Sequence, residues 1–177
     1  LSNSSGVVND LHQFENRAFL TSNEGDPFST WQRGTASGAV LSSVVTGSTN
    51  VYGTNISGQY GNNSTSYLYS GCYDLSNATN PVLSFDMAFD IENNWDLLYM
   101  EYSTDGGGNW NILGSAADPN WYNSNRLPNN SNCYNCLGAQ WTGSSTTLTN
   151  YSLSLSALNN PTEVVFRYVL RTDQSVT

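Results

Sequence analysis

The chain contains no lysine, and all five basic residues among its 177 are Arg. Charged residues make up 11% of the sequence, whereas roughly 25% is usual for a soluble domain. The 14 acidic residues set a formal net charge of -9. Because phosphate binding requires clusters of Lys and Arg, this charge argues against nucleic acid and against anionic membrane surfaces as partners.

Long apolar runs are absent as well, so the sequence predicts no transmembrane helix. No signal peptide is recognisable, and the chain starts at Leu1 instead of Met. We therefore interpret it as part of a longer secreted protein, located outside the cell or on a bacterial cell surface. Asn, Ser, Thr and Gly replace the missing charges, and the acidic surface suits calcium, which binds oxygen ligands.

Cysteine and histidine are almost absent. The three cysteines are an odd number, which argues against a full disulfide framework. The C-x-x-C pair of Cys133 and Cys136 fits half a zinc site, a redox dithiol or a local disulfide. Zinc lacks ligands, because His12 is the only histidine, and a redox motif lacks its βαβ context. We predict a disulfide within the loop and a buried free thiol at Cys72.

Short β-segments fill the chain, and no amphipathic helix is recognisable. Apolar and polar residues alternate strictly over 84–92, which is the pattern of a half-buried strand. Strands are expected at 11–16, 28–33, 50–56, 66–71, 81–92, 96–104, 109–114, 148–155 and 162–171, with turns notably at 21–26, 57–64 and 105–109. Many short strands with Gly and Asn turns predict an all-β fold, an antiparallel β-sandwich formed by one domain over 1–177.

Residues 103–110 fit the pattern S-x-D-x-G-x-x-W, called an Asp box. Asp105 is expected to accept hydrogen bonds from its own turn, and Trp110 is expected to pack onto the hairpin. The pattern also occurs in sialidases, but their chemistry needs an arginine triad and a Tyr nucleophile that one hairpin does not supply. We assign the Asp box a structural role.

A long Asn-rich loop at 115–143 carries four aromatic residues. Loops of this length in a compact domain are usually functional when ordered. Aromatic rings stack on the apolar face of a pyranose, and neighbouring amides bond its hydroxyls. We predict ligand binding by Trp121, Tyr122, Tyr134 and Trp141, with Trp95 as a neighbour. The alternative is that Trp121 and Trp141 pack the loop onto the sandwich.

The segment DIENNWD brings Asp90, Glu92 and Asp96 together at a turn between strands. Calcium takes six to eight oxygen ligands, so these carboxylates are candidate ligands; the alternative is a solvated acidic turn. The same strand is similar to the E-x-D-x-E strand of sandwich-fold glycoside hydrolases, which use paired carboxylates. Ala88 stands at the nucleophile position, so a hydrolase is the less favoured reading.

The order of several segments resembles a known family. The segments are Phe14-Glu15, VYGTNISGQY at 51–60, SYLYSGCYDLS at 66–76, LSFDMAFDIE at 83–92, EYSTDGGGNW at 101–110 and NWYN at 120–123. Together they are similar to extracellular jelly-roll domains related to MAM and reelin-repeat modules, which are frequent in secreted and surface proteins of Bacteroidetes. The resemblance implies a non-catalytic jelly-roll sandwich for adhesion or ligand binding, often with a structural cation.

The resemblance also implies where a cation would bind. The Glu of the initial Phe-Glu pair corresponds to Glu15, and Asp26 is the nearest candidate for an acidic partner. The family then continues into a strand with an Asp-Asp pair, about where this chain ends at 171–177. We therefore expect the final strand to be missing, and an open sheet edge to pair with a neighbouring chain or domain.

These observations lead to two expectations from different classes. The first is a secreted, non-catalytic module that binds a polysaccharide or cell-surface glycan, or mediates adhesion. The second is a structural or protein-interaction appendage of a secreted protease or surface filament.

Overall fold

The computed structural model describes residues 14, 19–35, 40, 49–56, 58–129 and 132–175, and strands dominate them. The strands are β1 (Leu20–Glu24), β2 (Trp31–Thr35), β3 (Asn50–Thr54), β4 (Thr65–Tyr73), β5 (Val82–Asp90), β6 (Leu97–Ser103), β7 (Asn111–Ile112), β8 (Ser144–Ser154) and β9 (Val164–Arg171). Two short 3-10 helices, η1 (Pro27–Ser29) and η2 (Ser156–Leu158), complete the elements. None of the described helices has the length and apolar character needed to cross a membrane.

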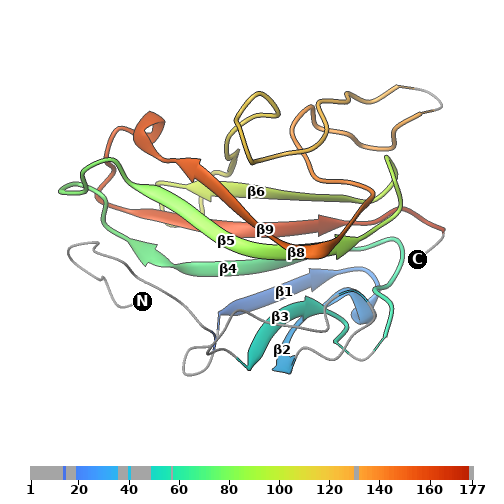
Figure 1. Cartoon of the computed structure of the whole chain (residues 1–177). Coiled ribbons are helices and arrows are strands. Elements are labelled where there is room, and N and C mark those ends of the chain that lie inside the picture. The colour runs from blue at the N-terminus through green and yellow to red at the C-terminus, as the bar shows by residue number, and fades with distance from the viewer. Residues whose placement is uncertain are drawn as a thin grey trace.

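The strands form an antiparallel sandwich. One sheet has five strands in the order β1-β4-β9-β6-β7, and β5 pairs with β8 in a second layer that lies in front of it in Figure 1. The pairs β4–β9, β5–β8 and β6–β7 are nested within one another along the chain, which is the arrangement of a jelly roll. The predicted all-β sandwich is confirmed.

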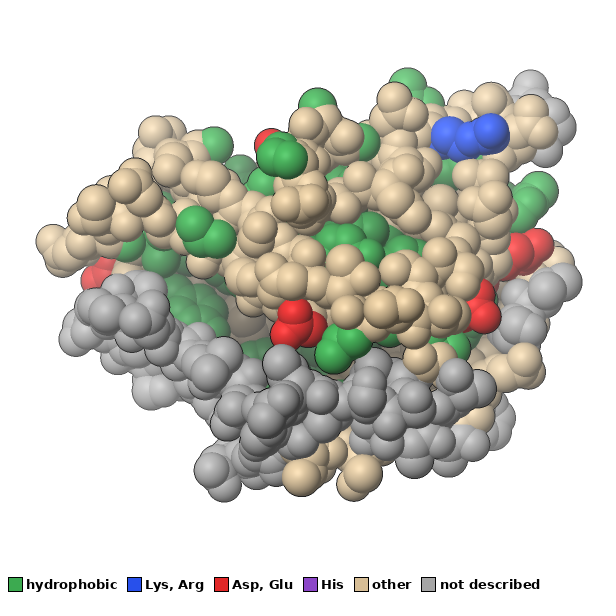
Figure 2. Space-filling view, viewed as in Figure 1, with side chains coloured by type: hydrophobic (Ala, Val, Ile, Leu, Met, Phe, Trp, Pro, Cys, Tyr) green, Lys and Arg blue, Asp and Glu red, His purple; other side chains and the backbone are tan. Residues whose placement is uncertain are grey.

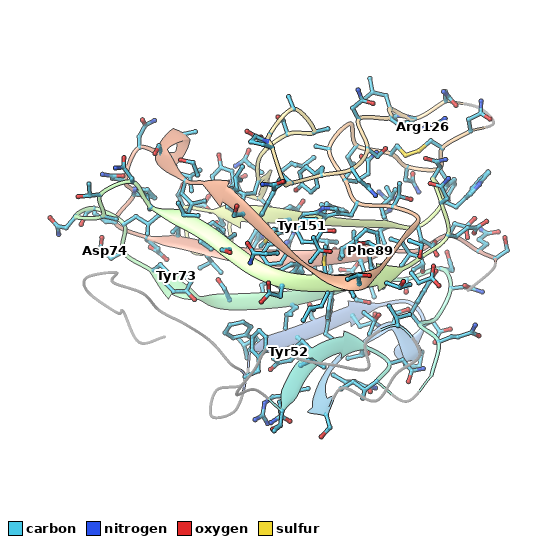
Figure 3. The ribbon with its side chains drawn as sticks, in the orientation of Figure 1. Tyr52, Tyr73, Asp74, Phe89, Arg126 and Tyr151 are labelled. Atoms are coloured by element: carbon cyan, nitrogen blue, oxygen red, sulfur yellow. A yellow bond between two sulfur atoms is a disulfide. The ribbon has the colours of Figure 1, made fainter. Side chains whose placement is uncertain are left out.

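The core lies between these two layers. Phe85 of β5 contacts Tyr168 of β9 with ring centroids 4.9 Å apart, and Tyr151 of β8 lies beside it at 5.9 Å. Figure 3 shows Tyr151 and Phe89 among the strands of the sandwich. The inward residues of β5 are the apolar members of the predicted alternation, which a register shift between Met87 and Phe89 interrupts. Period-2 patterning therefore placed this strand correctly.

One expected turn is a strand instead. Residues 21–26 carry turn-forming residue types, yet β1 pairs with β4 from Leu20 opposite Tyr69 to Glu24 opposite Thr65. The hydroxyl of Ser66 donates to the amide oxygen of Asn23 at 2.9 Å. Cross-strand contacts of this kind decide strand formation more than intrinsic propensity does. The strand expected at 11–16 lies outside the described residues except for Phe14.

The cysteine predictions are confirmed. Cys133 and Cys136 form a disulfide with their Cα atoms 5.8 Å apart, and Cys72 is a buried free thiol. The disulfide is the yellow bond in the loop that carries Arg126 (Figure 3). Figure 2 shows that the described surface over β5 and β8 is mainly uncharged, with scattered acidic groups.

The Asp box forms the turn between β6 and β7 as predicted. Asp105 accepts hydrogen bonds from the hydroxyl of Ser103 at 2.7 Å and from the backbone N–H of Asn109 at 2.9 Å. The indole N–H of Trp110 donates to the carbonyl of Gly107 at 3.1 Å. These bonds lower the pKa of Asp105 to about 2. The carboxylate stabilises the turn because its charge is satisfied locally.

Candidate functional site

The long loop between β7 and β8 places its largest rings in the core. Trp121, Tyr122 and Trp141 are 3%, 6% and 0% exposed. The indole N–H of Trp141 donates to the carbonyl of Trp121 at 2.9 Å, and the hydroxyl of Tyr122 donates to the carbonyl of Met100 at 3.2 Å. A buried ring offers no face to a sugar. The prediction that these three residues bind a ligand is therefore wrong.

The narrow layer of β5 and β8 explains this burial. β5 and β8 cover only part of the inner face of the five-stranded sheet: Trp31 of the β2–β3 pair contacts Tyr168 at 6.1 Å, and the rings of the loop pack against Phe85 and Tyr151. Phe85 lies 5.5 Å from Trp121 and 5.8 Å from Trp141, and Trp141 lies 5.3 Å from Tyr151, measured between ring centroids. Large rings contribute most to a core when they are removed from water. The alternative expectation, that Trp121 and Trp141 pack the loop onto the sandwich, is confirmed.

Trp95 and Tyr134, the other two predicted aromatic residues, form a pair at the surface. Their ring centroids are 6.1 Å apart and their planes are inclined by 21°. Tyr134 is 42% exposed, and Trp95 is half-buried. The backbone N–H of Tyr134 donates to the carbonyl of Asn94 at 2.9 Å, and the disulfide from Cys133 to Cys136 encloses the residue. The Tyr134 ring is thus held in place while much of it faces solvent.

A hollow of about 250 Å³ opens beside Tyr134. Tyr134 and Asn135 line one part of it, and Glu24 of β1, Asn63 before β4 and Arg171 at the end of β9 line the rest. Within the described part of the chain, the side chains of Glu24 and Arg171 have no hydrogen bond or ion pair. The hollow therefore combines an exposed ring with a carboxylate, a guanidinium and amides that remain able to bond a ligand.

Three carboxyl groups meet close to this hollow. One oxygen from each of Glu92, Asp96 and Asp173 lies within 4.8 Å of the others. Asp96 directly precedes β6 and is 0% exposed, and Asp173 is buried two residues after β9. Asp96 accepts the backbone N–H of Asp173 at 2.9 Å and the hydroxyl of Tyr60 at 2.6 Å. Strand ends from distant parts of the sequence thus bring the carboxylates together.

The carboxylate cluster of Glu92, Asp96 and Asp173 concentrates negative charge in a desolvated place. Burial raises the pKa of Asp96, against the opposing effect of its hydrogen bonds. Burial and the charges of Asp173 and Asp96 raise the pKa of Glu92. The Oε2 atom of Glu92 is buried and accepts no hydrogen bond within the described residues. An oxygen-binding cation would satisfy this atom and offset the repulsion, and the donor set suits Ca²⁺.

Thr142 fixes the backbone that carries two of these carboxylates. Its hydroxyl oxygen lies 2.9 Å from the carbonyl oxygen of Asp96 and 3.3 Å from that of Glu92. The same oxygen accepts the backbone N–H of Asn94 at 2.7 Å. The turn between β5 and β6 is therefore held by a residue from the end of the long loop, next to β8.

Gly61 plays the same part on the other side of the cluster. Its carbonyl accepts the hydroxyl of Ser29 at 2.7 Å and that of Thr172 at 3.1 Å. Two residues later, the backbone N–H of Asn63 donates to the carbonyl of Asp173. These bonds join η1, the segment before β4 and the segment after β9. The hollow and the carboxylate cluster consequently share the same supporting segments.

The sequence predicts two of the three clustered carboxylates. Glu92 and Asp96 are among the expected calcium ligands, and the structure places them together. Asp173 is the residue that sequence reasoning missed. The signal that could have identified Asp173 was the pair of acidic ligands that the family resemblance implies on a final strand, because Asp173 follows β9 by two residues. The position of the last strand against β6 had to be known before that signal could be used.

The other expected cation ligands are placed elsewhere. Asp90 is exposed at the end of β5, and Asp26 precedes η1; neither belongs to the described carboxylate cluster. Asp90 therefore does not join Glu92 and Asp96 as expected, because it faces solvent while the chain turns after it. Asp26 was expected to partner Glu15 at a separate site, and that expectation stays a prediction. Glu15 lies outside the described residues.

Asp90 and Glu92, the carboxylates compared with a hydrolase strand, have different surroundings. Asp86 and Asp90 are exposed, and Asp86 accepts the side-chain amide of Asn150 at 2.9 Å. Glu92 belongs instead to the carboxylate cluster beyond the end of β5.

Comparison with known proteins identifies no relative of this chain: no family model, curated protein or solved structure matches it. The resemblance to MAM-like and reelin-repeat modules therefore stays a prediction. The chemistry of the described residues is the basis on which a function can be argued.

Proposed function

We propose that this chain is a secreted, non-catalytic module that binds carbohydrate in the hollow beside Tyr134. The observation that carries the proposal is the exposed Tyr134 ring, stacked on Trp95 at the rim of a hollow whose charged side chains, Glu24 and Arg171, have no hydrogen bond or ion pair among the described residues. A sugar presents an apolar C–H face and a rim of hydroxyls, so it requires a flat ring next to hydrogen-bonding groups. Glu24 and Arg171 supply an acceptor and planar donors.

Ca²⁺ fits the neighbouring cluster as a structural cation. The residues that would hold it are Glu92, Asp96 and Asp173, whose oxygens lie within 4.8 Å of one another. The buried, unpaired Oε2 atom of Glu92 supports this assignment, since a buried charged oxygen without a partner destabilises the fold. Hard carboxylate oxygens are the ligands that Ca²⁺ prefers.

The cation would support the hollow because both use the same segments. Trp95 lies directly before the ligand Asp96, and Thr172 of the hollow lies directly before the ligand Asp173. Calcium would therefore hold the stacking pair and the end of β9 in one arrangement. Preorganisation of this kind improves affinity by lowering the cost of ordering the site.

The test is a screen of the purified chain on a glycan array, followed by calorimetry with any glycan that binds. Tyr134→Ala should weaken binding roughly tenfold or more while leaving Tm almost unchanged, because the ring is largely exposed. Leu127→Ala is the matched control, since Leu127 is an exposed apolar residue of the same loop outside the hollow. Trp141→Ala should instead lower Tm strongly by opening a cavity in the core.

Two results would contradict the proposal. The first is equal affinity of wild type and Tyr134→Ala for every glycan bound. The second is the absence of any glycan signal, which would favour the alternative of a structural or protein-interaction appendage of a secreted protease or surface filament.

A further inference from the structure

The five-stranded sheet has an outer face, defined as the side away from β5 and β8. Inward residues such as Met100 and Tyr168 pack into the core between the layers. Their neighbours along each strand point the opposite way, because side chains alternate across a sheet. The outer face therefore carries Tyr69 on β4 and Arg167 on β9, which are partly exposed. Val169 of β9 and Tyr99 of β6 point the same way but are 0% and 8% exposed, so the open part of this face lies over β1 and β4.

The hollow of the proposed binding site opens onto this outer face. Glu24, Thr65 and Arg171 stand directly opposite one another on β1, β4 and β9, and all three line the hollow. The next outward row along the strands holds Ser22 and Tyr67, which are also paired. Over β1 and β4, the floor of the hollow thus continues into the partly exposed sheet surface.

Three aromatic residues follow along that surface. The ring centroids of Tyr67 and Tyr69 are 6.0 Å apart, and those of Tyr69 and Trp110 are 5.8 Å apart. All three rings are partly exposed. Outward residues of an antiparallel sheet are normally polar when they face water, so a row of rings there requires an explanation.

Arg167 lies among these rings, and its positive charge is compensated by an ion pair. Its guanidinium carbon is 3.9 Å from the Trp110 centroid and 4.5 Å from the Tyr67 centroid. It also forms an ion pair with Glu101 at 2.6 Å, with both side chains 15% exposed. The pair offers hydrogen bonds without net charge. A polyanion would find no free cation at this position and would be repelled by the net charge of -9.

We infer that the ligand is an extended, uncharged polysaccharide chain that runs from the hollow across the outer face to Trp110. This inference rests on the proposed function of the hollow. Thr65 and Tyr69 are four residues apart on β4 and both are partly exposed, which corresponds to about 13 Å along a strand, so the surface spans more than one sugar unit.

The experiment measures how affinity depends on chain length. The probes are soluble xylan, glucomannan and mixed-linkage glucan, with polygalacturonate as the anionic counterpart, and then the disaccharide to hexasaccharide series of the polymer that binds. Affinity should rise with length and exceed that for polygalacturonate. Tyr69→Ala and Trp110→Ala should weaken hexasaccharide binding roughly three- to tenfold and leave disaccharide binding unchanged.

Controls separate binding from stability. Tyr69 is outside the buried core, so Tyr69→Ala should change Tm little, and it decides the question if Trp110→Ala fails to fold. Val82→Ala, an exposed apolar residue on β5 in the other layer, should bind every length like wild type.

The outcomes are distinguishable. If affinity is already maximal for the disaccharide, is lost in Tyr134→Ala and is unaffected by Tyr69→Ala, the inference of an extended chain is overturned. The proposed function of the hollow then still stands. An equal loss of affinity for oligosaccharides of every length in Tyr69→Ala would also overturn the inference. So would tighter binding of polygalacturonate than of the uncharged polymers. Failure of every probe to bind wild type would contradict both proposals.

Discussion

Asp105 and Asp96 lie at opposite ends of β6 and show two ways in which one residue type is used. Asp105 accepts hydrogen bonds from Ser103 and Asn109 on its own turn, and its pKa falls to about 2. Asp96 is buried near Glu92, and burial raises its pKa. The first carboxylate is satisfied by its neighbours in sequence. The second lies among other carboxylates, and a bound cation would offset their repulsion.

The calcium response should show the largest difference between the two regions. At a Ca²⁺ concentration 100-fold above Kd, binding to the folded state adds about 2.7 kcal/mol, or roughly 5–11 °C in Tm for a chain of this size. Glu92→Gln should lose most of this shift and melt higher than wild type in chelator, since it removes repulsion. Differential scanning calorimetry with and without Ca²⁺ measures both. An unchanged shift in Glu92→Gln would exclude the carboxylate cluster as the site.

The pH dependence of the calcium-free protein should differ in sign between the regions. Glu92 and Asp96 have raised pKa values in the folded chain, so the folded state binds their protons more tightly than the unfolded state does. Its stability should therefore fall as pH rises from 4 to 7 in chelator, and 1 mM Ca²⁺ should reverse the fall. Urea unfolding at a series of pH values tests this. A rise in stability over that range would contradict it.

Asp105 should have the opposite effect in a lower pH range, where it makes the stability of the fold rise with pH. Its pKa of about 2 lies below its ordinary value of 3.8, so the stability that it provides is lost as pH falls through this interval. At neutral pH, Asp105→Asn should lower Tm by about 2–4 °C, because the turn loses charge-assisted hydrogen bonds. The calcium shift should stay at its wild-type size. A variant that also lost the calcium response would show that the two regions are coupled.

The smallest effect is expected for Asp90→Asn. Asp90 is exposed two residues before Glu92 and is outside the carboxylate cluster. Its substitution should change the free energy of unfolding by no more than about 0.5 kcal/mol and leave the calcium shift intact. Thermal melts with and without Ca²⁺ provide the comparison. A reduced shift would mean that Asp90 contributes to the cation site.

Much of the fold could be predicted from local patterns. The alternation around Phe85 identified β5, the Asp box identified the turn after Ser103, and the spacing of Cys133 and Cys136 suggested their disulfide. Each pattern depends on contacts between residues close in sequence. β1 was missed because its residues have turn-forming types and its strand conformation comes from pairing with β4.

The candidate site was predicted only in part for the same reason. Trp121 and Trp141 have the same residue type as Trp95, and composition alone does not tell a core ring from a surface ring. Their burial follows from the gap beside the two-stranded layer of β5 and β8. The exposure of Tyr134 follows from its position in a disulfide-enclosed turn at the edge of the hollow.

By itself, the sequence determined the class of fold, the Asp box turn, the local disulfide and two of the clustered carboxylates. Those features arise from period-2 alternation and from bonds between near neighbours, which are written in short stretches of residues. The tertiary structure alone decided that Asp173 joins Glu92 and Asp96, and that Tyr134 meets Arg171 at one hollow. Both depend on antiparallel pairing that brings the ends of distant strands together, a long-range choice set by burial of the core.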